Sequence, residues 1–334
     1  MSSTNREPAK YRMQGAERWA WIAGIATLAF VQLSFAQDAP ELHRTFTVAA
    51  GEALTLDIDV PTGDLKILYG REGQVSIAGF AKGAADEKVE DNFFTTAVRI
   101  EQTGNRITIR QRSNRAYPEE DIKVLYWIDV PYRTEVTSRL GQGQQNIRGI
   151  LGPVNAVTEK GDIAAAYISR GLQARVGRGN LNLQVIGEHV AATTGSGNIS
   201  CTRLPQGVSA ETGDGDITLM VVGPSTATVK KGTGRIEVGG ARGTLVGSTD
   251  RGDLHVRAIP HDDWQLRSDS GNVRLDLPPA AQLELDVSTT SGEVQVDRED
   301  IAKPNGDPHH FSQTLNGRGK RIEVRTESGS IVIR

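Results

Sequence analysis

Apolar and polar residues alternate along most of this chain in short segments. In Leu181–Val185, for example, every second residue is aliphatic, which is the period of a half-buried β-strand. Most of these residues are branched, as strands prefer. The same alternation predicts further strands at residues 45–48, 54–60, 65–69, 75–80, 98–101, 107–110 and 122–130. Residues 84–94 lack Gly and Pro and are rich in charge, which favours a short surface helix, and residues 112–120 are expected to form a loop.

A glycine followed by a polar and then an aliphatic residue returns at nearly constant spacing. A fixed period of this size is typical of repeat architectures. Glycine at each corner is expected to supply backbone freedom where a side chain would be excluded. From Gly161 to Gly292 the steps are 18 to 21 residues, and the predicted corners are Gly161, Gly179, Gly197, Gly215, Gly234, Gly252, Gly271, Gly292 and, near the end, Gly329.

The second and fourth residues after each corner glycine form two apolar columns. One repeat is too short to bury its own apolar face, so repeats must stack to make a common core. A second strand in each repeat has small inward residues, predicted at Ala174, Ala192, Ala210 and Thr228. We therefore predict an all-β fold, a parallel β-helix or β-solenoid with about 18 residues per coil. The alternative is a β-sandwich of regularly spaced hairpins, although a sandwich does not need the same triplet in register.

The chain divides into a leader and one repeat domain. Residues 1–36 have the pattern of a signal peptide, with basic residues, an uncharged stretch from 19 to 36 and the small residues Ser34 and Ala36 at the cleavage positions. A retained membrane anchor is the alternative. Residues 37–44 are predicted to be a linker, residues 45–142 an irregular β cap continuous with the solenoid, and residues 143–334 the regular coils. Residues 299–320 should form an excursion, after which 321–325 and 329–333 close the rod.

Composition limits the possible functions. Aromatic residues make up only 5% of the 334 residues, so a narrow aliphatic core is expected. The formal net charge of −3 has no dominant block and does not indicate nucleic-acid binding. The single cysteine, Cys201, falls in an inward column and is expected to be a small buried hydrophobe.

The polar residue that follows each corner glycine forms a column of its own. Stacked Asn and Asp side chains bond neighbouring backbone at turns, and we expect that role here. Calcium is the alternative, since Gly213–Leu219 superficially resembles a calcium-binding β-roll, but that motif needs ligands from two successive turns. No metal or other cofactor is therefore predicted. The column is Asp162, Asn180, Asn198, Asp216, Arg235, Asp253, Asn272 and Glu293.

No catalytic constellation is visible in the sequence. Nucleophile elbows, phosphate-binding loops and dinucleotide fingerprints are absent. The two His-carboxylate clusters, 261–263 and 307–310, lack metal-ligand spacing and are expected to be solvated loops. Outward positions are poor in aromatic rings, and Trp264 aligns with Leu245, so we expect it in the core. The protein is predicted not to be an enzyme.

Several segments resemble a bacterial putative-adhesin family of unknown function, whose coils repeat Gly-Asp-Ile and Gly-Asn-Ile. The matching segments are Val130–Pro131, Thr158–Ile163, Thr193–Ile199 and Glu327–Ile331. The resemblance implies a single-stranded, right-handed β-helix exported to the cell envelope, and it supplies no catalytic residues. The sequence departs from the family pattern at Arg235 and at Gln144–Gln145.

The prediction is a non-enzymatic, exported β-helix protein that serves as an adhesin or structural scaffold. It would lie in the periplasm, cell envelope or extracellular space and present a repetitive surface, where many weak contacts replace a deep pocket. Its partner is predicted to be an envelope or surface component, with a glycan as one candidate and self-association as another. No nucleic acid is expected, and the membrane is contacted only through an uncleaved N-terminus. The alternative is a β-helix that binds or degrades polysaccharide.

Overall fold

The computed structural model describes residues 41–83, 92–112, 122–301, 306–317 and 319–334. The predicted signal peptide, most of the linker and the expected loop after residue 112 lie outside the described residues. Residues 37–334 form one compact unit. In the described part of the chain, no helix is long and apolar enough to cross a membrane.

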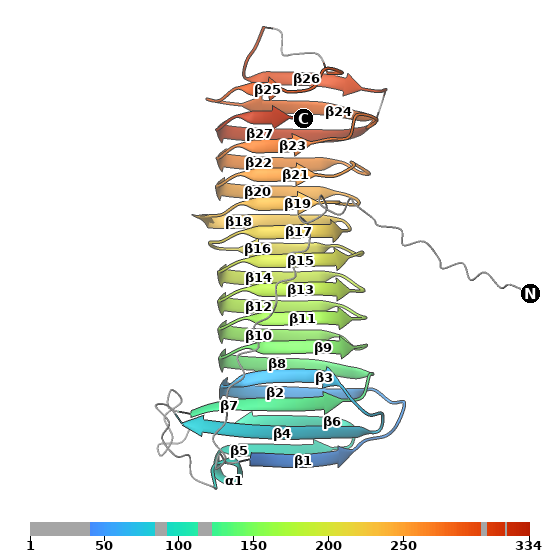
Figure 1. Ribbon diagram of the computed structural model, residues 1–334, viewed down its shortest axis with the longest axis vertical. Coiled ribbons are helices and arrows are strands. Elements are labelled where there is room, and N and C mark those ends of the chain that lie inside the picture. The colour runs from blue at the N-terminus through green and yellow to red at the C-terminus, as the bar shows by residue number, and fades with distance from the viewer. Residues whose placement is uncertain (1–40, 84–91, 113–121, 302–305, 318) are drawn as a thin grey trace, which may run out of the picture. The chain divides into compact units, whose positions relative to one another are not determined.

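Nearly all of the described chain is built into two long sheets (Figure 1). Sheet A contains, in spatial order, β1 (Glu41–Thr47), β4 (Gln74–Gly83), β7 (Ile122–Val130), β3 (Asp64–Tyr69), β9 (Gln145–Ile150), β11 (Ile163–Ile168), β13 (Leu181–Ile186), β15 (Ile199–Leu204), β17 (Ile217–Val222), β19 (Ile236–Gly239), β21 (Leu254–Arg257), β23 (Val273–Asp276), β28 (Ile331–Ile333) and β25 (Val294–Val296).

Sheet B is the second stack. Its spatial order is β26 (His310–Leu315), β24 (Leu283–Thr289), β27 (Lys320–Ser328), β22 (Trp264–Ser270), β20 (Leu245–Arg251), β18 (Ser225–Thr233), β16 (Val208–Thr212), β14 (Val190–Ser196), β12 (Leu172–Arg178), β10 (Val154–Lys160), β8 (Thr134–Gln142), β2 (Leu54–Thr62), β6 (Arg106–Gln111) and β5 (Val98–Thr103).

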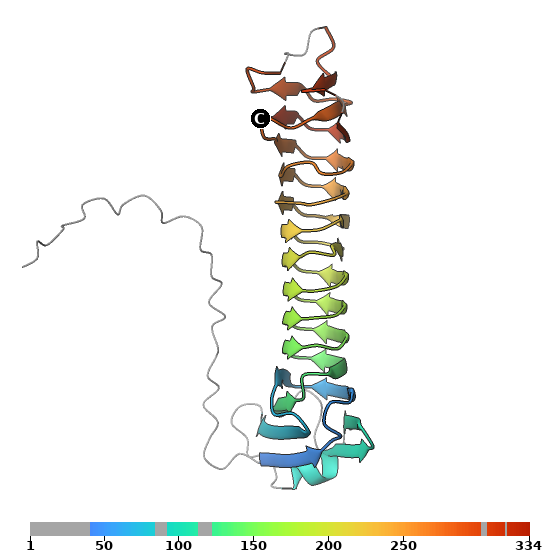
Figure 2. The same ribbon diagram turned by 90° about the vertical axis from the view of Figure 1, so that its right-hand side faces the viewer.

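From β8 to β23 the chain alternates between the sheets, and each strand pairs in parallel with the strand two further along (Figure 2). Ile163 pairs with Leu181 and Leu181 with Ile199, a step of 18 residues. The predicted all-β fold of stacked parallel strands is confirmed. The alternative of a sandwich built from hairpins is wrong for this region, because its neighbouring strands run parallel.

The aliphatic columns meet between the two sheets and form one continuous core. Leu183, Cys201 and Leu219 are each fully buried in neighbouring strands of sheet A, and Ala174, Ala192 and Ala210 face them from sheet B. The small inward residue predicted at Thr228 is wrong, because the register places Ala227 beside Ala210. That coil is one residue shorter than its neighbour, and an irregularity between Val229 and Thr233 restores the register.

At the glycine corners, backbone passes directly over backbone. Gly179 has φ 144° and Gly197 has φ 137°, a region that excludes most side chains. A Cβ on Gly197 would collide with the Gly179 carbonyl of the coil below, and Gly161, Gly215, Gly252, Gly271 and Gly329 sit over the preceding corner in the same way. Gly292 stacks on Gly329.

Polar side chains satisfy the backbone at these corners. The Asp162 carboxylate accepts from the Asn180 amide at 2.7 Å, and the Asn180 and Asn198 side-chain oxygens accept from the next coil at 2.9 Å each. This ladder confirms the structural interpretation of the polar column. It is interrupted at Arg235, whose backbone amide donates to Asp216 but whose side chain has no acceptor atom, and it resumes where Asp253 accepts from the Asn272 amide and Asn272 from the Ser330 amide. Buried hydroxyls add a second set of bonds, such as Thr194 to the Gly179 carbonyl and Thr212 to the Gly197 carbonyl, both 3.0 Å.

The ends of the stack differ from the sequence-based expectations. The last coil, β27 and β28, lies between β22/β23 and β24/β25, so it does not close the rod. The predicted excursion at residues 299–320 contains β26, which pairs antiparallel with β24 and forms the outer edge. Because the excursion is long, the chain can pass back beyond the coil formed by β24 and β25. The strands β27 and β28 then stack directly on β22 and β23, with Gly329 over Gly271.

The opposite end is covered by antiparallel strands as well. β1 pairs with β4, and β5 with β6. The helix α1 (Phe93–Ala97) buries Phe93 and Phe94 in the core. A surface helix was predicted at residues 84–94, of which 84–91 lie outside the described residues. The helix that the structure describes begins at Phe93 and packs its two Phe side chains inward. Pro61 does not end β2, which continues to Thr62.

Candidate functional site

One corner of sheet A has a strained backbone. Four successive coils place a non-glycine residue at positive φ: Tyr167 (58°), Val185 (54°), Arg203 (58°) and Val221 (56°). The same position is glycine in the coils on either side, Gly149 (73°) and Gly240 (68°). A left-handed backbone costs a side-chain-bearing residue roughly 1–2 kcal/mol, and such strain is concentrated at functional sites. We call these six residues the corner row.

The corner row presents side chains to solvent. Tyr167 is 56% exposed and Val221 is 50% exposed, and Arg203 is also on the surface. Glycine would adopt this backbone conformation without strain. The side chains of the corner row therefore contribute little to the stability of the folded state. A role in contacting another molecule accounts for both the strain and the exposure.

Next to the corner row lies a cluster of exposed aromatic rings. The aromatic cluster consists of Tyr69 (53% exposed), Tyr132 (40%) and Tyr167. The Tyr69 and Tyr132 rings pack edge to face, with centroids 5.5 Å apart. The Tyr132 hydroxyl is 3.5 Å from the hydroxyl of Ser169, two residues after Tyr167. The strands β3 and β11 and the turn after β7 therefore bring these rings to one edge, while the exposed Trp127 lies further along β7, beside Lys66.

Gly149 lies between two of these rings. In the register of β3, β9 and β11, Gly149 of β9 has Tyr69 on one side and Tyr167 on the other. A Cβ on Gly149 would lie 3.1 Å from the Tyr69 Cβ. Two rungs of a sheet span about 9.6 Å, so the two rings stand apart over a floor of bare backbone.

Cations accompany the rings. The Lys66 ammonium lies 3.6 Å from the centre of the Trp127 ring, and the Arg148 guanidinium lies 5.6 Å from the centre of the Tyr167 ring. The Trp127 indole donates to Asp129 at 3.0 Å. Both cations are attracted to the negative ring faces, which helps to hold the aromatic side chains in place.

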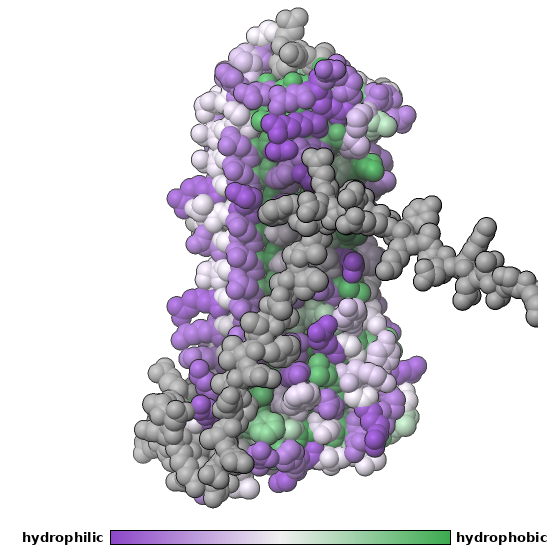
Figure 3. Space-filling view, viewed as in Figure 1, coloured by the Kyte–Doolittle hydropathy of each residue, from purple (hydrophilic) through white to green (hydrophobic). Residues whose placement is uncertain are grey.

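The outer surface of sheet A beside the corner row is flat, polar and almost uncharged. We call it the polar face, and it consists of the two outward columns from β9 to β17. No member is buried, none is acidic, and only Arg148 is charged. The members are Asn146, Arg148, Ala164, Ala166, Asn182, Gln184, Ser200, Thr202, Thr218 and Met220. Figure 3 shows polar and apolar side chains gathered in bands along the stack.

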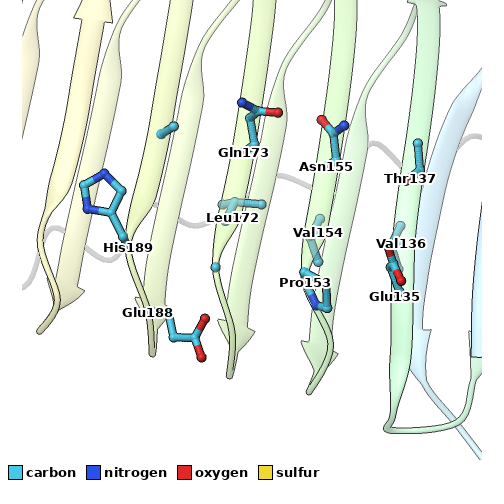
Figure 4. Close-up of a pocket in the computed structure, with 12 residues that line it drawn as sticks. Glu135, Val136, Thr137, Pro153, Val154, Asn155, Leu172, Gln173, Glu188 and His189 are labelled. Atoms are coloured by element: carbon cyan, nitrogen blue, oxygen red, sulfur yellow. The ribbon is translucent and has the colours of Figure 1, made fainter. Parts of the chain in front are cut away.

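The surface of sheet B has shallow grooves. One, of about 360 Å³, runs over the starts of four strands and is lined by Glu135, Pro153, Leu172, Glu188 and His189 among others. In Figure 4, Thr137, Asn155 and Gln173 form a row beside it, and the two glutamates lie at its ends. A second groove, near Arg139 and Lys160, also contains Asp59 and Glu159, so its charge is mixed. Neither groove brings together groups that fit a catalytic role.

The two His-carboxylate clusters are structural contacts between coils. Asp263 accepts from the Arg321 amide at 2.9 Å, and the Asp262 carboxylate pairs with Lys320. His309 bonds the Gly292 carbonyl, while His310 lies 3.2 Å from Asp286. Among the described residues, no group of three or more His, Cys, Asp or Glu side chains could hold a metal ion.

Burial opposes ionisation of Asp286, but hydrogen bonds from His310 and Arg321 keep its pKa below the usual value. The same competition occurs at Asp276, where Arg274 and His255 outweigh burial and hold the pKa at about 2. These carboxylates are ionised members of ion pairs and are poorly suited to proton transfer near neutral pH.

Three residues singled out in the sequence lie in the core. Cys201 is fully buried, and burial raises the pKa of its thiol to about 12. Trp264 is fully buried beside Leu245 and donates to the Gly243 carbonyl at 3.2 Å. Gln145 occupies an apolar column but is bonded to Ser138, Thr158 and the Val157 carbonyl, which explains why the repeat tolerates it.

The aromatic cluster was not predicted from the sequence. Outward positions of the regular coils are poor in aromatic residues, whereas Tyr69 and Tyr132 lie in the irregular part of the chain. Tyr167 was the available signal, since it stands where the coils on both sides have glycine or an aliphatic residue.

Stacked parallel strands, glycine corners and an exposed polar face define an all-β repeat protein with a surface site. The chain belongs to the family described as Toastrack DUF4097, whose profile matches residues 54–334. This agrees with the resemblance seen in the sequence. No curated protein matches.

Several solved structures are similar over most of their length. A putative adhesin from Parabacteroides distasonis has 14% identity and a TM-score of 0.34, covering 88% of this chain and 98% of that chain. A putative adhesin from Bacteroides fragilis has 10% identity and a TM-score of 0.33, covering 88% and 97%. A putative lipid binding protein from Parabacteroides distasonis has 9% identity and a TM-score of 0.36, also covering 88% and 97%. Likenesses at this level do not assign a function.

Proposed function

We propose that this protein is a non-catalytic, exported scaffold whose corner row and aromatic cluster form an adhesive surface for an envelope or surface component. The observation that carries the proposal is the strained corner row. Four consecutive coils keep exposed or partly exposed side chains where glycine would be more stable. Binding is the simplest compensation for that cost.

The shape of the surface supports adhesion over catalysis. Catalysis needs converging groups in a water-excluding pocket, whereas this surface is open and extends over several coils. Repeated weak contacts to an extended partner add up through avidity. Tyr and Trp also provide large, rigid contact areas at low entropy cost.

We further propose that the stack is a right-handed β-helix with coils of about 18 residues. Each return to the same sheet is a parallel crossover, and such crossovers are right-handed in about 98% of cases. The basic and uncharged segments of residues 1–36 support export. N-terminal sequencing of the protein recovered from the cell envelope tests this, and a cytoplasmic protein with an intact N-terminus would contradict it.

Adhesion is tested with beads that carry the purified protein. Bead retention on immobilised cell-envelope material is compared for wild type, a Tyr69→Ala/Tyr132→Ala variant and a sheet B control, Gln173→Ala/Thr193→Ala. We expect retention to fall only for the aromatic variant. Equal retention of both variants would show that the aromatic cluster is not the adhesive surface. Steady turnover of an envelope polysaccharide that co-purifies with the protein would refute the non-catalytic assignment.

A further inference from the structure

We infer that the adhesive surface binds an acidic polysaccharide chain, laid along the stack over the polar face and the corner row. The inference rests on the proposed function and adds the class of ligand. Three features of the surface lead to it: the aromatic rings, the amide and hydroxyl rows, and the sign of the charge.

The rings offer platforms for sugar rings. A pyranose has C–H groups on its faces and hydroxyls around its rim, and an exposed tyrosine presents a matching apolar face with a polar tip. Tyr69 and Tyr167 stand on either side of the Gly149 floor, where no side chain blocks the approach of a ligand ring. The cluster is thus open to a ring-shaped ligand at one end of the polar face.

The polar face offers partners for hydroxyl groups. Asn182, Gln184, Ser200, Thr202 and Thr218 carry amides or hydroxyls that both donate and accept hydrogen bonds, as sugar hydroxyls do. They lie on three neighbouring strands, β13, β15 and β17, about 4.8 Å apart, so a linear polymer along the stack meets an amide or hydroxyl at each of these three rungs, whereas β11 presents Ala164 and Ala166.

The charge favours acidic sugars. The polar face contains no acidic side chain; its one charged member is Arg148, and Arg203 lies in the adjacent corner row, while the carboxylates Glu72 and Asp129 lie outside the face, bonded to Tyr132 and Trp127. Arg148 is placed beside the Tyr167 ring, so a carboxylate on a stacked sugar can pair with its guanidinium. The corner row from Gly149 to Gly240 spans five rungs, about 24 Å, which is long enough to contact several sugars of one chain.

The test uses polygalacturonate as the probe and its carboxyl-reduced form as the neutral control. Binding to the full-length protein is measured by calorimetry at low and high salt. We expect binding to polygalacturonate that weakens at high salt, and binding to the reduced polymer at least about tenfold weaker, because the carboxylate pairs are lost.

The decisive variant is Tyr167→Gly. Glycine occupies this position in the neighbouring coil, so the substitution removes the ring while relieving the positive φ. We expect affinity for polygalacturonate to fall about tenfold while the melting temperature does not fall, a combination that a structural role for Tyr167 would not produce. Arg203→Gly should likewise weaken binding without loss of stability, and Arg175→Gln on sheet B is the matched control with unchanged affinity.

Three results would overturn the inference. They are equal binding to both polymers, full affinity in the Tyr167→Gly variant, and binding to anionic lipid vesicles in place of the polymer. If polygalacturonate does not bind but bead adhesion still depends on Tyr69 and Tyr132, the ligand class is wrong and the proposed function stands. If adhesion also fails to depend on them, the proposed function fails as well.

Discussion

Substitution of Gly197 by alanine tests the claim that the corner glycines are required by both backbone conformation and stacking. Gly197 has φ 137°, and its added Cβ would collide with the Gly179 carbonyl, which is backbone and cannot rotate away. The strained φ costs about 1–3 kcal/mol, and forced overpacking costs a similar amount. The expected loss of stability is therefore about 2–5 kcal/mol.

Gly104→Ala is the matched control. Gly104 also has positive φ, at 57°, but a Cβ there would meet no atom within 4 Å. Its expected cost is about 1 kcal/mol, since the strain of a left-handed residue is partly offset by lower entropy of the unfolded chain. The difference between the two variants isolates the contribution of coil stacking.

The assay is thermal unfolding combined with amide hydrogen exchange, because repeat proteins open locally as well as globally. In Gly197→Ala, exchange should accelerate at the Gly179 and Gly197 amides, which bond to Ser196 and Asp214 of the following turns at 2.9 Å and 2.8 Å. Equal destabilisation in both variants, or unchanged exchange at these amides, would refute the stacking argument.

Three further predictions follow from single residues. The pKa of Asp276 is lowered from 3.8 to about 2 in the folded protein. The ionised carboxylate therefore contributes its full stabilisation above about pH 4, and this contribution is lost as the pH falls toward 2. Over that interval, the melting temperature of the wild type should fall by more than that of Asp276→Asn. Cys201, with its pKa raised to about 12, should resist alkylation at mildly alkaline pH until denaturant unfolds the protein, and rapid native modification would contradict its burial. Val221→Asn should stabilise the protein by roughly 0.5–1 kcal/mol, because Asn tolerates the left-handed region that a β-branched residue does not; Thr218→Asn, on the same strand, should show no such gain in urea unfolding.

The repeat made most of the fold predictable. The glycine triplet and the two aliphatic columns are local patterns that recur in register, so they indicated the stacked strands, the inward Cys201 and the buried Trp264. The strand predictions at residues 54–60 and 122–130 agree with β2 and β7 to within two residues. Where the period changed, the predictions failed, as at Thr228, because a one-residue shortening shifts the partners in β18 until the irregularity between Val229 and Thr233 restores the register.

The candidate site was less accessible from the sequence. Tyr69, Tyr132 and Tyr167 are spread over about a hundred residues and share no motif. Their proximity depends on β3 lying between β7 and β9, which reverses the order along the chain. Backbone strain at Tyr167 and Val221 is likewise a property of the corner geometry, and residue type alone would have argued against positive φ there.

The sequence by itself determined the repeating unit: which residues turn inward, where the backbone must be bare, and which side chains bond the next coil. These are decided within one or two coils, where spacing and residue type suffice. The tertiary structure decided how the ends close and which side chains share a surface. β28 lies between β23 and β25, and Tyr69 and Tyr167 lie on either side of Gly149, because non-local strand pairing brings together segments that no local pattern connects.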